Sequence, residues 1–184
     1  MAQPTRQEAI SVLNEGHAEI HRLLDGIPEA ELVRLGTIGG GEWSAKDLIG
    51  HIATWEELAV RTLEEWRRGE KPWVEHDDGP FGDSGQDGID AFNAQNIDKK
   101  RPLSLRDVQN EADAIHDRLI DAIDGLPDEA WRAKATYPTS QDRRRTLSAL
   151  LGGILGAPKR PFGHAFAHLP DAESFAASIR PTGV

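Results

Sequence analysis

The chain has 184 residues and a formal net charge of -10, from 21 basic and 31 acidic side chains. A chain of this length forms one domain more readily than two, so we predict a single domain over residues 1–184. The excess of acidic side chains opposes contact with nucleic acid or an anionic membrane, and we expect neither as a partner. The chain has no cysteine, so any metal site must use histidine, carboxylate or amide groups.

No stretch of the sequence reaches the roughly 18 apolar residues that a membrane helix needs. The opening segment MAQPTRQEAI also lacks a long apolar run. Together with the lack of cysteine, this leads us to expect a cytoplasmic protein.

Two long helices are predicted in the first third of the chain. Thr5 can cap a helix that ends at about Asp25 and carries an inward stripe of apolar residues. Ser44 can cap a second helix that runs to Trp66, and Asp47 completes an acidic variant of the capping box. The apolar stripe of the second helix contains Leu48, Ile52, Trp55, Leu58, Ala59 and Leu63.

A long polar region follows the second helix. Residues 69–88 are rich in Pro, Gly and Asp and predict a long loop between the second and third long helices. Residues 89–100 predict a short helix. Ser104 can cap the third long helix, which has the clearest helical periodicity in the chain, and Trp131 is predicted to pack a short helical turn onto the bundle.

The last part of the chain contains an interrupted helical pattern. Thr146 can cap the apolar segment LSALLGGILG, in which glycines weaken the helix. Pro158 and Pro161 then interrupt the helix, FGHAFAHL resumes the helical spacing, and Pro170 stops or kinks it. Because no alternating strand pattern is present, we predict an all-α fold, an up-and-down four-helix bundle with a long loop between helices 2 and 3.

Three histidines form a candidate metal site. His164 and His168 are four residues apart, which places both imidazoles on one face of a helix and suits two ligands of one ion. His51 lies beside the apolar stripe of the second helix, where an unpaired polar ring costs about 1 to 3 kcal/mol. Together the three rings would leave positions open for water or substrate, as catalytic metal sites do.

The spacing of these histidines also allows a second interpretation. His164 and His168 would then be exposed or loop residues, and His51 a hydrogen-bonded core residue. A further pair with the same spacing, His17 and His21, is attributed to chance because the sequence indicates no third ligand.

Two other polar residues are assigned ordinary structural positions. His116 is expected at the rim of the bundle, next to the inner face of the third long helix. Glu56 is expected on the exposed face of the second helix. Neither is therefore predicted to belong to a site.

A substrate pocket is predicted from Trp55, Trp73 and Asn93. The Asn93 amide could project into the mouth of the bundle, or it could serve a local turn. The long loop carries Trp73 and Phe81 and is a candidate lid over the pocket.

The segment EWSAKDLIGHIATWEE resembles the second helix of the DinB-like superfamily, which includes YfiT-like proteins and is built as a four-helix bundle. The resemblance covers the order of the main helices across nearly the whole chain. It implies a divalent metal, zinc or nickel, held by His51, His164 and His168. In that family the last helix is usually continuous, whereas glycines and prolines surround the last two histidines here.

The middle of the chain, from IDAFNAQN to LPDEAW, is similar to the ClbS/DfsB branch of the superfamily, in which metal is not a secure feature. The two resemblances support two hypotheses. Under the first hypothesis, the chain is a metal-dependent hydrolase or transferase that acts on a small electrophilic or thiol-bearing molecule in detoxification or self-protection. The sequence identifies no catalytic residue beyond the metal ligands. Alternatively, the chain is a metal-free protein that binds or sequesters a small molecule, with Trp55, Trp66 and Trp73 lining an apolar cavity. A homodimer formed through a helix face is a further possibility that the sequence allows.

Overall fold

A computed structural model describes residues 3–39, 42–82, 85–137, 145–158 and 160–180. Helices account for all the regular elements in these ranges, and the predicted all-α class is confirmed. The elements are α1 (Arg6–Leu24), α2 (Glu29–Leu32), α3 (Ala45–Arg67), the 3-10 turn η1 (Trp73–Glu75), α4 (Gln86–Lys100), α5 (Leu105–Asp124), α6 (Asp128–Trp131), α7 (Leu147–Ile154) and α8 (His164–Ile179).

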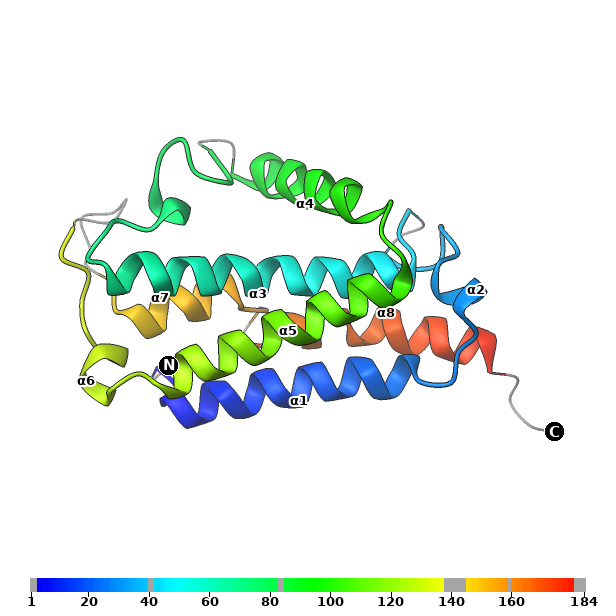
Figure 1. Cartoon of the computed structure of the whole chain (residues 1–184), viewed down its shortest axis with the longest axis horizontal. Helices are drawn as coiled ribbons and strands as arrows, with labels where there is room; N and C mark the ends of the chain where they lie inside the picture. Colours follow the sequence, from blue (N-terminus) through cyan, green and yellow to red (C-terminus); the bar gives the residue numbers. More distant parts are fainter. Residues whose placement is uncertain (1–2, 40–41, 83–84, 138–144, 159, 181–184) are drawn as a thin grey trace.

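The bundle is built around α3 (Figure 1). Helix α5 packs along α3, while α1 packs against α5 and α8. Helix α4 covers another side of α3, and the fourth position of the bundle is shared by α7 and α8, which both contact α3. The last bundle helix is therefore broken into two pieces.

The predicted helix starts are confirmed by their capping hydrogen bonds. Thr5 and Ser44 both form capping boxes, with Glu8 and Asp47 respectively at the third helical position. In the second box, the Asp47 carboxylate accepts from the Ser44 amide at 2.9 Å, inside the buried part of the molecule. Ser104 and Thr146 cap α5 and α7 in the simpler way, by accepting one backbone N–H each. These bonds satisfy amide groups that a helix leaves free at its start.

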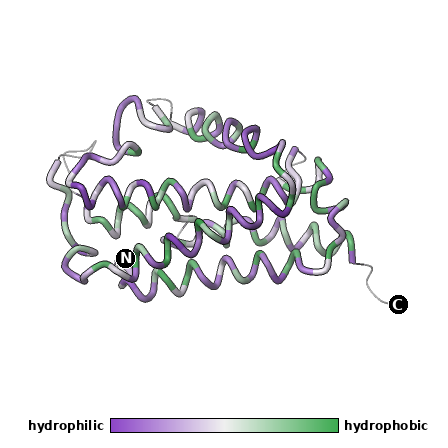
Figure 2. Tube along the Cα trace, viewed as in Figure 1, coloured by the Kyte–Doolittle hydropathy of each residue, from purple (hydrophilic) through white to green (hydrophobic). Residues whose placement is uncertain are grey.

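The long polar region is more ordered than the sequence predicts. It contains η1, and α4 begins at Gln86 rather than near Ile89. Residues 83–84 of the predicted loop lie outside the described residues. Figure 2 shows that α4 is largely hydrophilic, in contrast to the apolar stripes of the bundle helices. Helix α4 is therefore a cover on α3 rather than a fifth member of the core.

Helix α3 is buried on more of its surface than the periodicity of its sequence predicts. Glu56, expected to be exposed, is 5% exposed, and His116, expected at the rim, is 4% exposed. His116 Nδ1 lies 3.1 and 3.2 Å from the two Glu56 carboxylate oxygens, and His116 Nε2 lies 3.0 Å from Asn14 Oδ1. Both expectations were wrong because helices cover α3 from several sides, and the buried carboxylate is satisfied by a histidine from α5.

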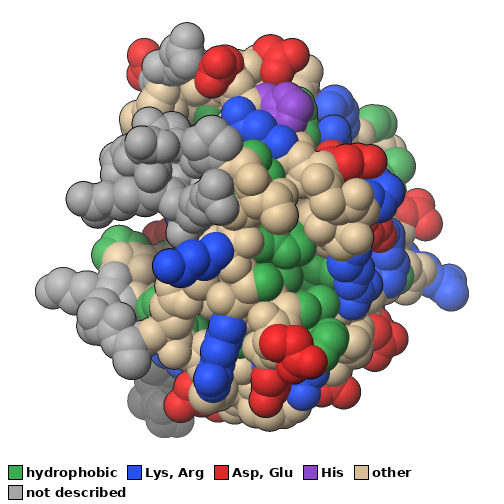
Figure 3. Space-filling model, turned by 90° about the vertical axis from the view of Figure 1, so that its left-hand side faces the viewer, with side chains coloured by type: hydrophobic (Ala, Val, Ile, Leu, Met, Phe, Trp, Pro, Cys, Tyr) green, Lys and Arg blue, Asp and Glu red, His purple; other side chains and the backbone are tan. Residues whose placement is uncertain are grey.

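The surface carries charges of both signs. Figure 3 shows the end of the molecule at which α6 lies, where Lys, Arg, Asp and Glu side chains surround a central group of hydrophobic side chains. Within the described ranges, none of the helices is both long enough and apolar enough to cross a membrane.

Helices α1 and α8 approach each other closely at Gly16, and this close approach can be tested by substitution. A Cβ atom on Gly16 would lie 2.9 Å from Ala165 Cβ, next to His164. Gly16→Val should therefore push the two helices apart and destabilise the protein by about 1 to 3 kcal/mol, even though valine favours helix more than glycine does. Urea unfolding followed by circular dichroism measures the change.

Gly153 provides the matched control. It also lies in a helix, α7, but a Cβ atom there would meet no atom within 4 Å. Gly153→Val makes the same substitution and should leave the stability unchanged or raise it by a few tenths of a kcal/mol. Equal effects of the two substitutions would show that the contact between α1 and α8 is not close.

Candidate functional site

The turn between α7 and α8 sets the position of the last two histidines. Phe162 adopts a positive φ of 62° in this turn, a conformation that costs a non-glycine residue roughly 1 to 2 kcal/mol. Its ring is buried and stacks on Trp131 with the centroids 5.6 Å apart, which offsets this cost. The His164 amide donates to the Leu155 carbonyl at 2.9 Å and closes the turn. Helix α8 therefore starts in a defined orientation.

The break in the last helix precedes both histidines, so the pair stays on one continuous helix. Pro158 and Pro161 lie in the turn, and α8 runs through Pro170 to Ile179. The sequence predicts that the last helix is interrupted, and the structure contains this interruption. Because it lies before His164, His164 and His168 stay on the same face of α8.

The structure brings His51, His164 and His168 together. One ring nitrogen from each of the three lies within 4.8 Å of those of the other two. His51 Nε2 and His164 Nε2 are 3.0 Å apart, and the His168 ring centroid lies 4.9 Å from that of His51 and 5.0 Å from that of His164. The 3.0 Å between the His51 and His164 nitrogens matches the edge of a ligand polyhedron around one ion, about 3.0 to 3.5 Å for ligand bonds of about 2.0 to 2.2 Å. A His168 ring nitrogen lies within 4.8 Å of the other two and completes the set.

Burial keeps these three rings neutral. Desolvation, with smaller contributions from the neighbouring histidines, lowers the pKa of His51 to about 2 and that of His164 to about 3. Desolvation also lowers the pKa of His168, partly opposed by the nearby Asp171 carboxylate. His51 is buried, while His164 and His168 are half-buried. Neutral imidazole is the form that binds a metal.

The surrounding groups orient the rings. A hydrogen bond between the His164 ring and the Gly156 backbone, in the turn before α8, partly opposes the lowering of the His164 pKa. The Trp43 ring packs 4.8 Å from His51. Asp47, one turn before His51, is engaged in the capping box with Ser44.

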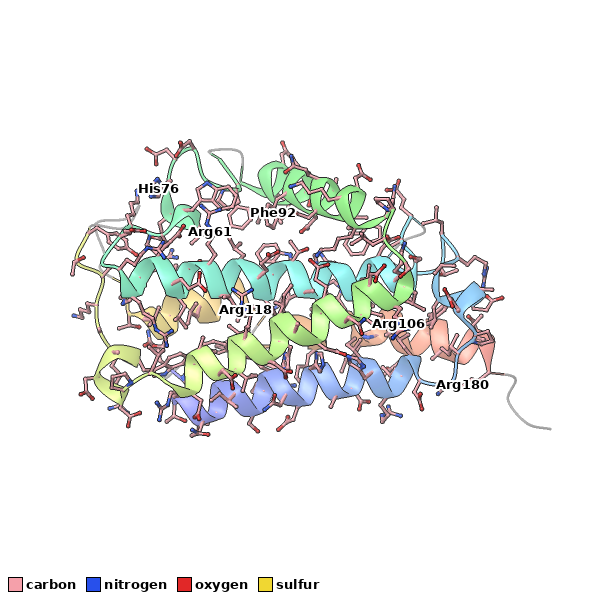
Figure 4. The ribbon with its side chains drawn as sticks, in the orientation of Figure 1. Arg61, His76, Phe92, Arg106, Arg118 and Arg180 are labelled. Carbon is pink, nitrogen blue, oxygen red and sulfur yellow. The ribbon has the colours of Figure 1, made fainter. Side chains whose placement is uncertain are left out.

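An aromatic cluster forms one wall beside the histidines. The Trp55 ring lies 5.4 Å from that of His164 and stacks on Phe81 at 5.5 Å. Phe92 projects from α4 toward α3 (Figure 4) and meets Trp55 edge-on at 5.8 Å. Asn93 Oδ1 accepts a hydrogen bond of 3.0 Å from Trp55 Nε1, so the Asn93 amide holds the orientation of the indole.

A cavity of about 430 Å³ borders this aromatic wall, and its lining does not include His51, His164 or His168. Trp55 and Phe81 line it, together with residues from the start of α4, from α7 and from the segment after η1. At its edge the Arg145 guanidinium lies 3.4 Å from the Glu75 carboxylate. The volume lies within the range of small-molecule pockets, about 300 to 1,000 Å³.

The other tryptophans lie elsewhere. Trp73 lies under the Arg61 guanidinium at 4.1 Å and lines a separate cavity between α3, α4 and α5. Trp66 packs edge-on against Tyr137 at 6.0 Å. Of the predicted pocket residues, Trp55 and Asn93 are therefore in direct contact, whereas Trp73 packs against the same hydrophobic cluster as Trp55 but lines a different cavity.

Comparisons with known proteins agree with this architecture. A sequence model described as the DinB superfamily matches residues 12–156, a range that contains His51 and ends before His164. A comparison with curated protein sequences found no match.

Several solved structures have a similar fold. An uncharacterised protein from Escherichia coli UTI89 matches with a TM-score of 0.70 and 14% identity, over 97% of this chain and 95% of that chain. The colibactin self-resistance protein ClbS, in complex with double-stranded DNA, matches with a TM-score of 0.64 and 13% identity, over 97% and 95% of the two chains. The mycothiol-dependent maleylpyruvate isomerase matches with a TM-score of 0.57 and 16% identity, over 100% of this chain and 65% of that chain.

The ClbS structure corrects the expectation that excluded nucleic acid. That expectation rested on the net charge of -10, and a protein of similar fold has been crystallised with double-stranded DNA. Net charge is a sum over the whole surface, whereas contact with a phosphate backbone depends on local groups of basic side chains. The total charge was therefore the wrong quantity on which to base an exclusion.

The lowered pKa values predict how the stability of the metal-free protein depends on pH. Between the folded pKa values of His51 and His164, about 2 and about 3, and the ordinary value near 6.5, the unfolded chain binds more protons than the folded chain. Stability should therefore fall as the pH decreases below about 6.5, by up to about 2 kcal/mol for each ring at pH 5 relative to pH 7.5. Urea unfolding at the two pH values measures this loss.

Two variants isolate the contribution of the site from that of other titrating groups. His164→Gln removes one buried imidazole and should lose less stability than the wild type over the same pH interval. His76→Gln removes an exposed imidazole and should behave as the wild type does. If His164→Gln and the wild type lose the same amount, the ring is not held neutral by burial.

Proposed function

Because the chain belongs to the DinB superfamily, we propose that it is a metal-dependent enzyme that acts on a small electrophilic or thiol-bearing molecule. The reaction is a hydrolysis or a group transfer of the kind that serves detoxification or self-protection. The observation that carries this proposal is the convergence of three neutral imidazoles beside an aromatic wall.

The chemistry of the donor set fits a divalent ion such as Zn²⁺ or Ni²⁺. His51, His164 and His168 would hold the ion through three nitrogen atoms, the ligand type that both metals accept. Three protein ligands leave at least one position open, and the two half-buried rings of α8 lie on the side that solvent reaches. A bound divalent ion would supply Lewis-acid chemistry, polarising an electrophilic group or lowering the pKa of a thiol or a water molecule.

The other residues of the site would bind and shield the substrate. Trp55, Phe81 and Phe92 offer apolar faces to the carbon skeleton of a small molecule and exclude water from one side of the histidines. The Asn93 amide holds Trp55 in place through the indole N–H. Phe81 belongs to the segment between η1 and α4, so movement of this segment would open the aromatic wall, as expected of a lid.

Two of the similar structures support a role with small molecules. One is named as dependent on mycothiol, and the other as conferring self-resistance to colibactin. Their identities to this chain, 16% and 13%, show a common fold and leave the substrate open.

The second candidate function is binding of a small molecule without metal, as in a sequestration protein. It is favoured by the 430 Å³ cavity lined by Trp55 and Phe81, which does not need the histidines to hold an apolar ligand. In that function the contact of 3.0 Å between His51 and His164 is a hydrogen bond between two neutral rings.

Metal analysis separates the two candidates. The protein is purified without a nickel resin, and its metal content is measured by mass spectrometry. As purified, with no metal added, the wild type should carry close to one equivalent of zinc or nickel at the three histidines. His51→Ala and His168→Ala should each lower the affinity at least about tenfold, since loss of a group that only hydrogen-bonds to a ligand already costs 10- to 100-fold. His76→Ala, which removes an exposed histidine, should retain the metal.

Turnover of a thiol with a reactive electrophile is then compared between the metal-loaded and metal-stripped forms. Loss of turnover on stripping, and its return on reloading, is the expected result. A wild-type protein that takes up no metal and binds small ligands equally well with or without His51→Ala would overturn the metalloenzyme proposal in favour of sequestration.

A further inference from the structure

A second group of metal-ligating side chains lies between α1 and α5, apart from the three histidines described above. It consists of His17 and His21 from α1 and Asp113 from α5. The helical spacing of the two histidines places their rings one above the other, with centroids 4.3 Å apart. The sequence alone indicated no third ligand for this pair, and the packing of α5 against α1 supplies one.

We propose that His17, His21 and Asp113 form a second binding site for a divalent transition-metal ion. One ring nitrogen of each histidine and one oxygen of the aspartate all lie within 4.8 Å of one another. Asp113 Oδ1 lies 3.3 Å from His17 Nε2 and 3.1 Å from His21 Nε2. Ligands bound at about 2.0 to 2.2 Å to one ion are separated by about 3.0 to 3.5 Å, so both distances are those of neighbouring ligands.

The competing interpretation is an ion pair between Asp113 and the two imidazoles. The distances alone allow it, but Asp113 Oδ1 is buried and accepts no hydrogen bond of acceptable geometry. Two imidazole nitrogens thus lie close to this oxygen without an N–H directed at it. A shared cation satisfies the oxygen and both rings at once.

The surroundings hold the ligands in place. His17 stacks on His116 with centroids 4.0 Å apart and planes 9° from parallel, and His116 is itself fixed between Glu56 and Asn14. A cavity of about 20 Å³ borders both His17 and His21 on their inner side, room for about one water molecule. On the outer side, the His21 and Asp113 side chains are 42% and 50% exposed, so an ion can enter from solvent.

Two imidazoles and one carboxylate suit divalent ions of the first transition row, such as Zn²⁺ and Co²⁺. The half-exposed position predicts weaker binding than at His51, His164 and His168. Because its ligands come from two helices, an ion here would also link α1 to α5 and stabilise the folded chain.

The test uses the full-length protein stripped of metal and titrated with Zn²⁺ in equilibrium dialysis. The wild type should bind two equivalents, and Asp113→Asn should weaken the second equivalent at least about tenfold, since even loss of a group that only hydrogen-bonds to a ligand costs 10- to 100-fold. Asp117→Asn is the matched control: it makes the same change of charge one turn later on α5, outside the ligand set. It should alter the affinity only about two- to threefold, because the Asp117 carboxylate acts on His17 through its charge alone.

A second background separates this site from the proposed enzyme site. His164→Gln combined with His168→Gln should still bind one equivalent of Zn²⁺ and show a metal-dependent rise in melting temperature, which Asp113→Asn should abolish. If this background does not fold, the comparison of Asp113→Asn with Asp117→Asn in the otherwise wild-type chain decides. A folded double variant that binds no Zn²⁺, or an Asp113→Asn variant with unchanged stoichiometry and affinity, would overturn the proposal.

Discussion

Helix α3 lies against α4, α5, α7 and α8, so most of its side chains are removed from water and each polar group among them needs a partner inside the protein. Thr54 and Thr62 donate to backbone carbonyls one turn earlier in the same helix. The Glu65 carboxylate accepts from the Trp73 amide at 2.7 Å and so ties η1 to α3. Glu56 pairs with His116 of α5, and His51 contacts His164 of α8. The burial of one helix thus determines where the rest of the polar chemistry lies.

This burial explains why both histidine groups stand next to α3. His51 contacts His164 of α8. Glu56, more than one turn later, contacts His116 of α5, which in turn stacks on His17 of α1. A buried polar ring on α3 requires complementary groups on the opposing helices, and histidine can meet that need by hydrogen bonding or by sharing an ion. For each group, one interpretation places a metal ion between the side chains and the other a direct hydrogen bond or ion pair. Both interpretations need the same packing of the helices.

The broken last helix shows how a local interruption is compatible with a precise site. Phe162 adopts a left-handed conformation at the turn, and burial of its ring against Trp131 offsets the conformational cost. The turn also brings the Gly156 backbone to the His164 ring. A continuous helix would carry the same HxxxH pair, but the groups that orient its first ring come from the turn.

Much of the fold could be predicted from the sequence, because caps and apolar periodicity are local properties. Thr5, Ser44, Ser104 and Thr146 mark the starts of four helices, and the hydroxyl that caps each one lies within three residues of the amide it satisfies. The HxxxH spacing of His164 and His168 is local in the same sense. Only the tertiary structure decided the rest: that Glu56 and His116 are buried, that Trp73 and Trp55 line different cavities, and that Asp113 meets His17 and His21. Each depends on how segments distant in the sequence pack together, as Glu56 and His116 do from 60 positions apart, and periodicity along one helix does not contain this information.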